Sequence, residues 1–175
     1  MTEPAQIPDQ AAREAAATTF DRNVVVIAGA GTGKTTLLVN RLLYLLMRRT
    51  DPLDLSRIVA LTFTNKAATE MKLRLRERLR SLVNVEGRDN PAAGSGTVSI
   101  ADLRMRYGWT TDEIVARADA ALRDVEKAQI GTLHSFAAHL LRLYPIEAGV
   151  TPTLQTDADG SRLEEHIASE RETWL

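Results

Sequence analysis

The sequence of 175 residues contains no cysteine. Disulfide bonds and thiolate metal sites are therefore excluded, and a reducing compartment, the cytoplasm, is the expected location. The first ten residues lack the basic and apolar regions of a secretory signal. The longest apolar helix candidate, residues 37–47, is interrupted by Asn40 and Arg41 and is too short to span a bilayer, so we expect no membrane partner.

The chain also has no large net charge: its formal net charge is −1. The charges are unevenly distributed: residues 66–88 carry seven basic and three acidic side chains, whereas residues 151–175 carry two basic and six acidic ones. This polarity would allow one side of the molecule to bind an anion, although two solvated helix faces would give the same pattern.

Hydrophobic residues make up 44% of the chain, which suffices for a globular domain with a buried core. Two short apolar runs rich in β-branched residues, 24–28 and 57–63, predict buried parallel strands. Helices are expected at 9–20, capped by Asp9, at 34–49, and at 65–83, capped by Thr64 or Asn65. Further helices are expected at 110–127, with a Thr110–Glu113 capping box, at 134–145, and from Asp157 or Asp159 onward. Two more strands are expected at 128–133 and 151–156. Alternating strands and helices indicate an α/β fold, a parallel sheet with helices on both faces.

The stretch IAGAGTGKTT, residues 27–36, follows the first predicted strand. Its residues 33–35 satisfy the end of the phosphate-loop pattern G-x-x-x-x-G-K-[ST], whereas Ala28 replaces the first glycine. Backbone N–H groups of such a loop, and the N-terminus of the following helix, bind phosphate oxygens. We therefore expect a triphosphate here, with Lys34 reaching its β- and γ-phosphates and Thr35 coordinating Mg²⁺.

Three further segments resemble motifs of superfamily 1A DNA helicases of the UvrD, Rep and PcrA kind, in that family's order. PDQAAREA, around Gln10, is similar to the adenine-reading Q motif. ALTFTNKAATEMKLRLRERL, residues 60–79, is similar to the motif after the phosphate loop, and GTLHSFAAHLL, residues 131–141, to the next one. The resemblance implies a RecA-like P-loop NTPase domain of an ATP-dependent helicase that acts on single-stranded DNA in repair or recombination.

The resemblance also implies the site residues. ATP and Mg²⁺ would be bound by Gln10, Ala28, Gly29, Ala30, Gly31, Thr32, Gly33, Lys34, Thr35 and Thr36. Among these, Gln10 would hydrogen-bond to the adenine edge, and Lys34 and Thr35 would be catalytic. Single-stranded DNA would contact Thr62, Phe63, Thr64, Asn65, Lys66, His134, Ser135 and Phe136. The two phenylalanines offer faces for base stacking, unless they are core aromatics.

The interval between the second and third segments is longer than in UvrD and Rep proteins, and in this it resembles the RecB and AddA branch of helicase-nucleases. That branch implies a helicase-nuclease partner subunit. We expect residues 1–83 to form the N-terminal part of the ATP-binding domain, residues 84–126 a helical insertion, and residues 127–175 the continuation of the domain and the start of a helical subdomain.

The carboxylates needed for ATP hydrolysis are not found after an apolar strand. The nearest candidate, VSIADL, places Leu103 after Asp102 where a glutamate belongs, so we reject it. The chain is therefore interpreted as an incomplete first motor domain that binds Mg-ATP weakly, does not hydrolyse it alone and works with the rest of a helicase chain. Two alternatives stay open: a small P-loop kinase, and a non-catalytic DNA-binding accessory domain.

Overall fold

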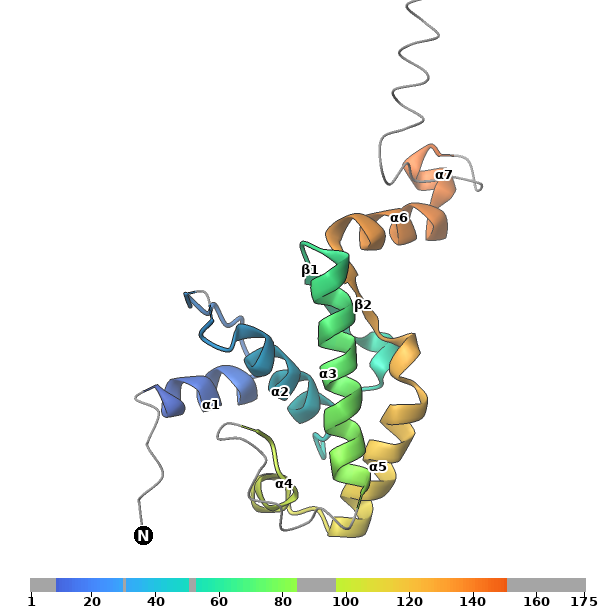
Figure 1. Cartoon of the computed structure of the whole chain (residues 1–175). Coiled ribbons are helices and arrows are strands. Elements are labelled where there is room, and N and C mark those ends of the chain that lie inside the picture. The colour runs from blue at the N-terminus through green and yellow to red at the C-terminus, as the bar shows by residue number, and fades with distance from the viewer. Residues whose placement is uncertain (1–8, 30, 51–52, 85–96, 151–175) are drawn as a thin grey trace, which may run out of the picture. The chain divides into compact units, whose positions relative to one another are not determined.

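The computed structural model describes residues 9–29, 31–50, 53–84 and 97–150 (Figure 1). The chain divides into two compact units, residues 1–132 and 133–175, which are described separately. The first unit combines a small parallel sheet with helices, so the α/β prediction holds at this level. The predicted strand at 151–156 and the helix after it lie outside the described residues.

Two strands, β1 (Val59–Thr62) and β2 (Gln129–Thr132), pair in parallel, with Val59 opposite Gln129 and Thr62 opposite Thr132. Both lie where the sequence predicts strands. Strand β1 is less buried than expected, because Val59 remains 48% exposed. The register brings the carboxyl ends of β1 and β2 to the same edge of the sheet.

The strand predicted at residues 24–28 is not formed, which corrects the expectation of a buried strand before the phosphate loop. Residues 23–29 have no regular secondary structure, and the side chains of Val25 and Ile27 are 86% and 98% exposed. A run of β-branched residues becomes a strand only when a neighbouring strand takes its hydrogen bonds and another layer covers its side chains. Among the described residues, the sheet consists of β1 and β2 and offers this run no partner.

Two helices flank the phosphate loop, α1 (Gln10–Thr18) and α2 (Lys34–Leu46), and they pack against each other. Arg41 on α2 donates through Nη1 to the carbonyl oxygen of Ala16 at 2.6 Å, and its guanidinium lies 4.8 Å from the centre of the Phe20 ring. Asp9 does not cap α1 with its side chain, contrary to the prediction, because the carboxylate accepts a hydrogen bond from Arg13 instead.

The long helix α3 (Asn65–Val83) follows β1 and matches its predicted range. Thr64, rather than Asn65, is its cap: Thr64 Oγ1 accepts a hydrogen bond from the backbone N–H of Ala67 at 3.1 Å. Short 3₁₀ turns at Leu55–Arg57 and Val125–Lys127 precede β1 and β2.

The described part of the predicted insertion is helical and consists mainly of α4 (Ile100–Tyr107) and α5 (Thr111–Arg123). Each helix begins with a capping box, Ser99 with Asp102 and Thr110 with Glu113. The Thr110–Glu113 box was predicted. Asp102 therefore stands in the first turn of a helix and not at the end of a strand, in agreement with its rejection as a hydrolytic carboxylate.

The insertion helices belong to the core of the first unit. Helix α5 lies along α3 (Figure 1), and the Nε1 atom of Trp109 donates to the carbonyl oxygen of Met47 at 2.8 Å. Arg117 on α5 donates to the carbonyl oxygen of Leu46, so the insertion satisfies two carbonyls at the C-terminal end of α2. The largest fully buried side chains come from α2, α3, the insertion and the turn before β1: Val39, Leu43, Met47, Leu55, Leu75, Leu79, Leu103 and Ile114.

The described part of the second unit contains α6 (Leu133–Leu143) and the single turn α7 (Pro145–Ala148). The predicted helix there is confirmed, and Pro145 opens α7 after α6 has ended. Within the described ranges, none of the helices combines the length and apolarity needed to span a bilayer.

Candidate nucleotide-binding and DNA-binding sites

The phosphate-loop candidate makes a tight glycine turn directly before α2. Gly31 and Gly33 have φ angles of 73° and 84°, in the left-handed region that glycine adopts without strain. Helix α2 begins at Lys34, with Thr35 and Thr36 in its first turn, both half-buried. The backbone N–H groups at the start of α2 therefore lie next to the loop, the arrangement that binds phosphate in such sites. Ala30, also predicted as a site residue, lies outside the described residues.

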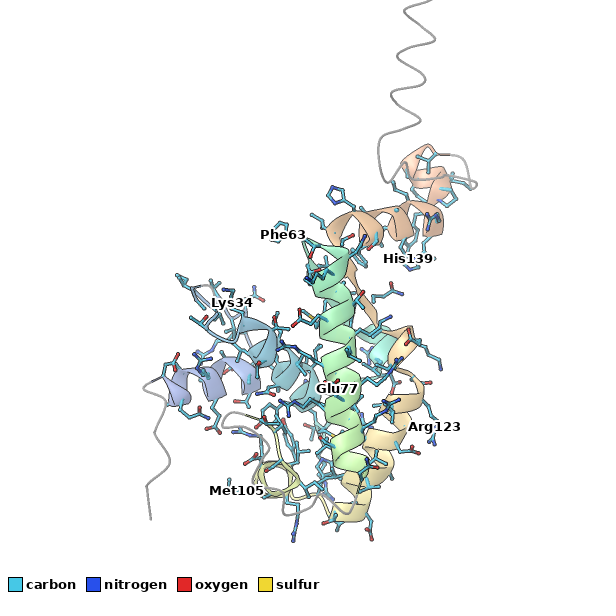
Figure 2. The ribbon with its side chains drawn as sticks, viewed as in Figure 1. Lys34, Phe63, Glu77, Met105, Arg123 and His139 are labelled. Carbon is cyan, nitrogen blue, oxygen red and sulfur yellow. The ribbon has the colours of Figure 1, made fainter. Side chains whose placement is uncertain are left out.

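The side chain of Lys34 folds back over the loop (Figure 2). Its Nζ atom donates to the carbonyl oxygens of Ala28 and Gly29, at 3.0 and 2.5 Å. The Thr32 hydroxyl donates to the same Gly29 oxygen at 2.8 Å. The structure therefore brings the lysine together with the loop that precedes it.

Arg13 is a residue of this site that the sequence reading missed. Its Nη1 atom donates to the carbonyl oxygen of Thr32 at 2.8 Å, and its Nε atom donates to Asp9 Oδ1 at 2.8 Å. The hydrogen bond from Arg13 holds the pKa of the Asp9 carboxyl below its ordinary value. The spacing in the sequence could have indicated this residue, because Arg13 follows Gln10 by three residues and both therefore lie on one side of a helix.

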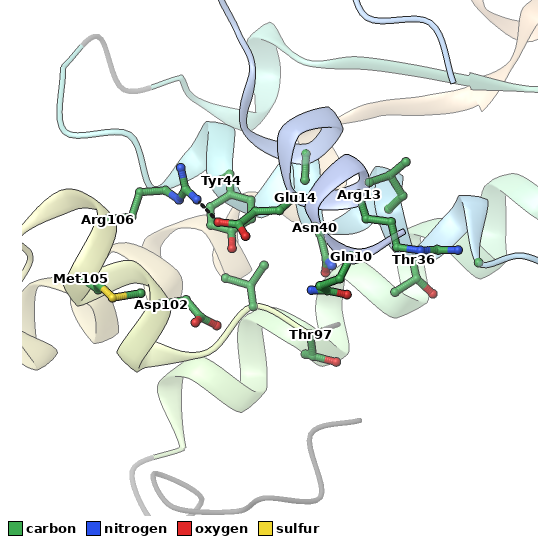
Figure 3. A pocket seen from close by; sticks show the side chains of 14 residues that line it. Gln10, Arg13, Glu14, Thr36, Asn40, Tyr44, Thr97, Asp102, Met105 and Arg106 are labelled. Atoms are coloured by element: carbon green, nitrogen blue, oxygen red, sulfur yellow. Dashed lines mark hydrogen bonds and ion pairs between the residues drawn. The ribbon is translucent and has the colours of Figure 1, made fainter. Parts of the chain in front are cut away.

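A cavity of about 680 Å³ lies beside the loop (Figure 3). Gln10 from α1, together with Gly33 and Thr36 from the loop and the first turn of α2, lines it. The structure thus places the predicted adenine-reading residue next to the phosphate loop. The remaining wall includes Asp102 and Arg106 from α4, whereas Ala28, Gly29, Thr32 and Lys34 line a separate cavity.

The segment after β1, predicted to contact DNA, is accessible. Phe63 is 96% exposed and is therefore not a core aromatic in this structure (Figure 2). Asn65 and Lys66 are also exposed, and Thr62 Oγ1 donates to the carbonyl oxygen of Thr64 at 3.0 Å. The exposed ring and the N-terminus of α3 together form a surface suited to a base and a phosphate.

The other predicted DNA-contacting residues stand in the first turn of α6, in the second unit. His134 and Ser135 are exposed there, and Phe136 is half-buried. The chain enters α6 directly from the end of β2.

Part of the positive charge predicted for α3 is paired. Lys72 contacts Glu126 at 3.0 Å, and Arg76 contacts the same carboxylate. Lys72 is the main cause of the lowered pKa of Glu126. Because Lys72, Arg74 and Arg76 are paired with carboxylates, α3 has fewer free positive charges than its composition suggests. Within the described residues, Lys66, Arg78 and Arg80 take part in no ion pair.

The family model of the UvrD/REP helicase N-terminal domain matches residues 9–173, which include the phosphate loop, both predicted DNA-contacting segments and the insertion. The chain belongs to this family. The helicase resemblance in the sequence is therefore confirmed, including the suspected AddA branch, because the curated relatives are helicase/nuclease subunits.

Three of these relatives are each named as the A subunit of an ATP-dependent helicase/nuclease. The protein of Bacillus pumilus is 32% identical over 151 residues, covering 85% of this UvrD/REP-family chain and 10% of the relative. That of Desulforudis audaxviator is 34% identical over 132 residues, covering 75% and 9%. That of Desulforamulus reducens is 33% identical over 138 residues, covering 79% and 9%. The chain thus spans about a tenth of the length of the curated relatives it matches.

Proposed function

We propose that this chain is the ATP-binding N-terminal part of an ATP-dependent DNA helicase that acts on single-stranded DNA. The observation that carries the proposal is the left-handed glycine turn at Gly31 and Gly33, which leads directly into α2 at Lys34. Small-residue loops that enter a helix in this way bind phosphate through backbone N–H groups, and the lysine adds a mobile positive charge.

Each nucleotide contact has a residue of suitable chemistry. Lys34 exchanges its contacts with the Ala28 and Gly29 carbonyls for the β- and γ-phosphates, and the Gln10 amide donates to and accepts from adenine. In the part of the chain that the structure describes, no group of three or more His, Asp and Glu could hold a metal ion. The Thr35 hydroxyl would hold Mg²⁺, whose charge would offset the negative charge of the phosphates.

We also propose a RecA-like first motor domain in the whole protein. Its support is the family membership together with the parallel pairing of β1 and β2, whose carboxyl ends share one edge. Ligands of open α/β sheets bind at such edges. The segments Thr62–Lys66 and His134–Phe136 each follow one of these strand ends and are the proposed DNA contacts.

The partners follow from the same proposal. The relatives are named as one subunit of a helicase/nuclease, which supports two partners for the whole protein: a different helicase/nuclease subunit, and the rest of the helicase chain. The name that these relatives carry favours the helicase hypothesis over the hypothesis of a small P-loop kinase. The experiment must therefore distinguish the helicase hypothesis from an accessory domain that binds DNA without ATP.

The decisive experiment is a calorimetric titration of the 175-residue chain with Mg-ATP. We expect weak binding that Lys34→Ala abolishes, whereas Lys127→Ala, a control at an exposed lysine outside the loop, leaves it unchanged. Binding of DNA without any binding of ATP would support the accessory domain instead. Phosphate transfer to a nucleotide or metabolite would support the kinase.

Turnover is tested separately, with saturating single-stranded DNA. We expect no ATP hydrolysis above background, because the sequence holds no Asp-Glu pair after an apolar strand. Robust hydrolysis that Lys34→Ala removes would show that the chain carries a complete catalytic site and that its interpretation as a binding part is wrong.

A further inference from the structure

A smaller cavity, of about 310 Å³, lies between α2 and α3, which pack against each other. Its side on α2 includes Thr36, and its side on α3 includes Arg74, Glu77 and Arg78. The described residues of the phosphate loop before Thr36 do not line it, so it is distinct from the proposed triphosphate site. Its volume is at the lower end of the range of small-molecule sites, which suits a ligand of few atoms.

Two arginines bring positive charge to this cavity. Arg74 and Arg78 are four residues apart on α3, so their side chains lie on one face of the helix, where like charges repel each other. Arg74 pairs with Glu70, one turn earlier, whereas Arg78 takes part in no ion pair within the described residues. Arg78 is also half-buried. Because a guanidinium that loses water without gaining an opposite charge is destabilised, an anion in the cavity would stabilise both arginines.

Glu77, which stands on α3 (Figure 2), brings a negative charge to the same cavity. Successive side chains on a helix do not face each other, and no ion pair joins Glu77 to Arg78 in the part of the chain that the structure describes. An ionised carboxylate only accepts hydrogen bonds, so it repels an oxyanion that has no proton. Inorganic phosphate keeps at least one P–O–H group at neutral pH, whereas sulfate and the phosphodiesters of nucleic acids have none. The combination therefore favours a phosphate that carries a proton.

We propose that this cavity binds inorganic phosphate, with Arg74 and Arg78 donating to its oxygens and Glu77 accepting from its P–O–H group. Guanidinium groups present their N–H donors in a planar fork that matches phosphate oxygens. Arg74 can donate to phosphate while it remains paired with Glu70, because a guanidinium has five N–H donors. The Thr36 hydroxyl, in the first turn of α2, supplies a further polar group on the opposite side.

The test is a titration of the ¹⁵N-labelled 175-residue chain with phosphate, followed by the backbone amide shifts of residues 74–81 in NMR spectra. Chloride replaces phosphate at constant ionic strength, so that screening does not change. The titration uses Lys34→Ala, which weakens any binding of phosphate at the loop, and we expect the shifts to saturate in this variant. Adding Arg78→Gln should lower the affinity by about tenfold, the size of one hydrogen bond to a charged group. The matched control is Arg80→Gln, at an exposed arginine of the same helix outside the cavity, which should leave the affinity unchanged.

Selectivity is tested with sulfate and with dimethyl phosphate, a diester without a P–O–H group. We expect each to bind about tenfold more weakly than phosphate, because neither can donate to Glu77. Glu77→Gln should remove most of this difference by raising the affinity for sulfate, since an amide can donate to an oxygen that has no proton. The control Glu70→Gln, at a carboxylate that does not line the cavity, should keep the preference for phosphate.

The proposal is overturned if phosphate shifts no amide of residues 74–81, or if Arg78→Gln and Arg80→Gln bind phosphate alike. Sulfate that binds as tightly as phosphate would also overturn it. Dimethyl phosphate that does so would overturn it in favour of a nucleic-acid strand as the occupant. None of these outcomes bears on the proposed ATP site, whose own test is the loss of Mg-ATP binding in Lys34→Ala.

Discussion

Arg13 on α1 donates a hydrogen bond through Nη1 to the carbonyl oxygen of Thr32, at 2.8 Å, and so ties the first helix to the phosphate loop. The same guanidinium pairs through Nε with Asp9. A Cβ atom added at Gly33 would lie 3.4 Å from Arg13 Nη1, which leaves little space between the arginine and the loop. The arginine thus restricts the loop through Thr32, and Lys34 restricts it through its hydrogen bond to the carbonyl oxygen of Gly29.

Replacing Arg13 should loosen this loop without unfolding the domain. We expect Arg13→Ala to weaken Mg-ATP binding by about fivefold, the equivalent of one ordinary hydrogen bond. Calorimetry measures the change, with Arg57→Ala, an exposed arginine outside the site, as control. Unchanged ATP affinity in Arg13→Ala would show that the contact with Thr32 does not restrict the loop in a way that matters for binding.

Phe63 should matter for DNA and not for stability, because its side chain is 96% exposed. We expect Phe63→Ala to lower the affinity for a labelled single strand by about tenfold, in the range measured for loss of one base–aromatic stack. Fluorescence anisotropy at several salt concentrations measures it. The slope of affinity against salt should stay the same, because no phosphate contact is lost. The control is Leu73→Ala on the exposed side of α3.

Helix α3 offers a matched pair of leucines for a test of the core. Leu75 is fully buried, whereas Leu73 is 51% exposed. Leu75→Ala should lower the free energy of unfolding by about 3 kcal/mol, because it leaves a cavity among packed side chains. Leu73→Ala should change it by less than about 0.5 kcal/mol. Urea unfolding followed by circular dichroism gives both values, and equal losses would contradict the packing of α3 described above.

The capping box of α5 predicts a pH dependence. The backbone N–H of Thr110, and then its hydroxyl, hold the pKa of Glu113 below its ordinary value of 4.5. Because the folded pKa is the lower one, the stabilisation by Glu113 is complete above about pH 5. It is lost as the pH falls from 4.5 through the folded value, since the unfolded chain binds the proton first.

This dependence is measured as the difference in unfolding free energy between the wild type and Glu113→Gln. The difference should be constant near neutral pH and should shrink as the solution is acidified below pH 4.5. The comparison isolates Glu113 from Asp9 and Glu126, whose pKa values are also lowered. A difference that stays constant down to about pH 3 would show that Glu113 titrates alike in the folded and unfolded chains.

Several features that depend on neighbouring residues were predicted correctly from the sequence, although the cap at Asp9 was not. The range of α3, the Thr110–Glu113 box and the glycine turn before α2 all match the structure. Each depends on residues within one or two turns of each other, so the local pattern contains the necessary physical information. The helicase family was likewise recognisable, because its motifs are short and keep their order.

Features that depend on residues far apart in the chain were not predicted from the sequence. The run at residues 24–28 has the composition of a buried strand, yet strand formation requires hydrogen bonds from another strand, and the described chain provides none for it. The spacing of Arg13 from Gln10 indicates that both lie on one side of α1, but the sequence does not show that Arg13 contacts Thr32 or that Asp102 lines the cavity beside Gln10.

The sequence alone therefore determined most of the helices, the caps at Thr64 and Thr110, the phosphate-loop turn and the family, because these arise from local chemistry. Only the tertiary structure decided that the insertion packs into the core, that it lines the cavity next to Gln10, and that the apolar run before the loop stays exposed. These outcomes depend on which surfaces, far apart in the chain, meet and exclude water.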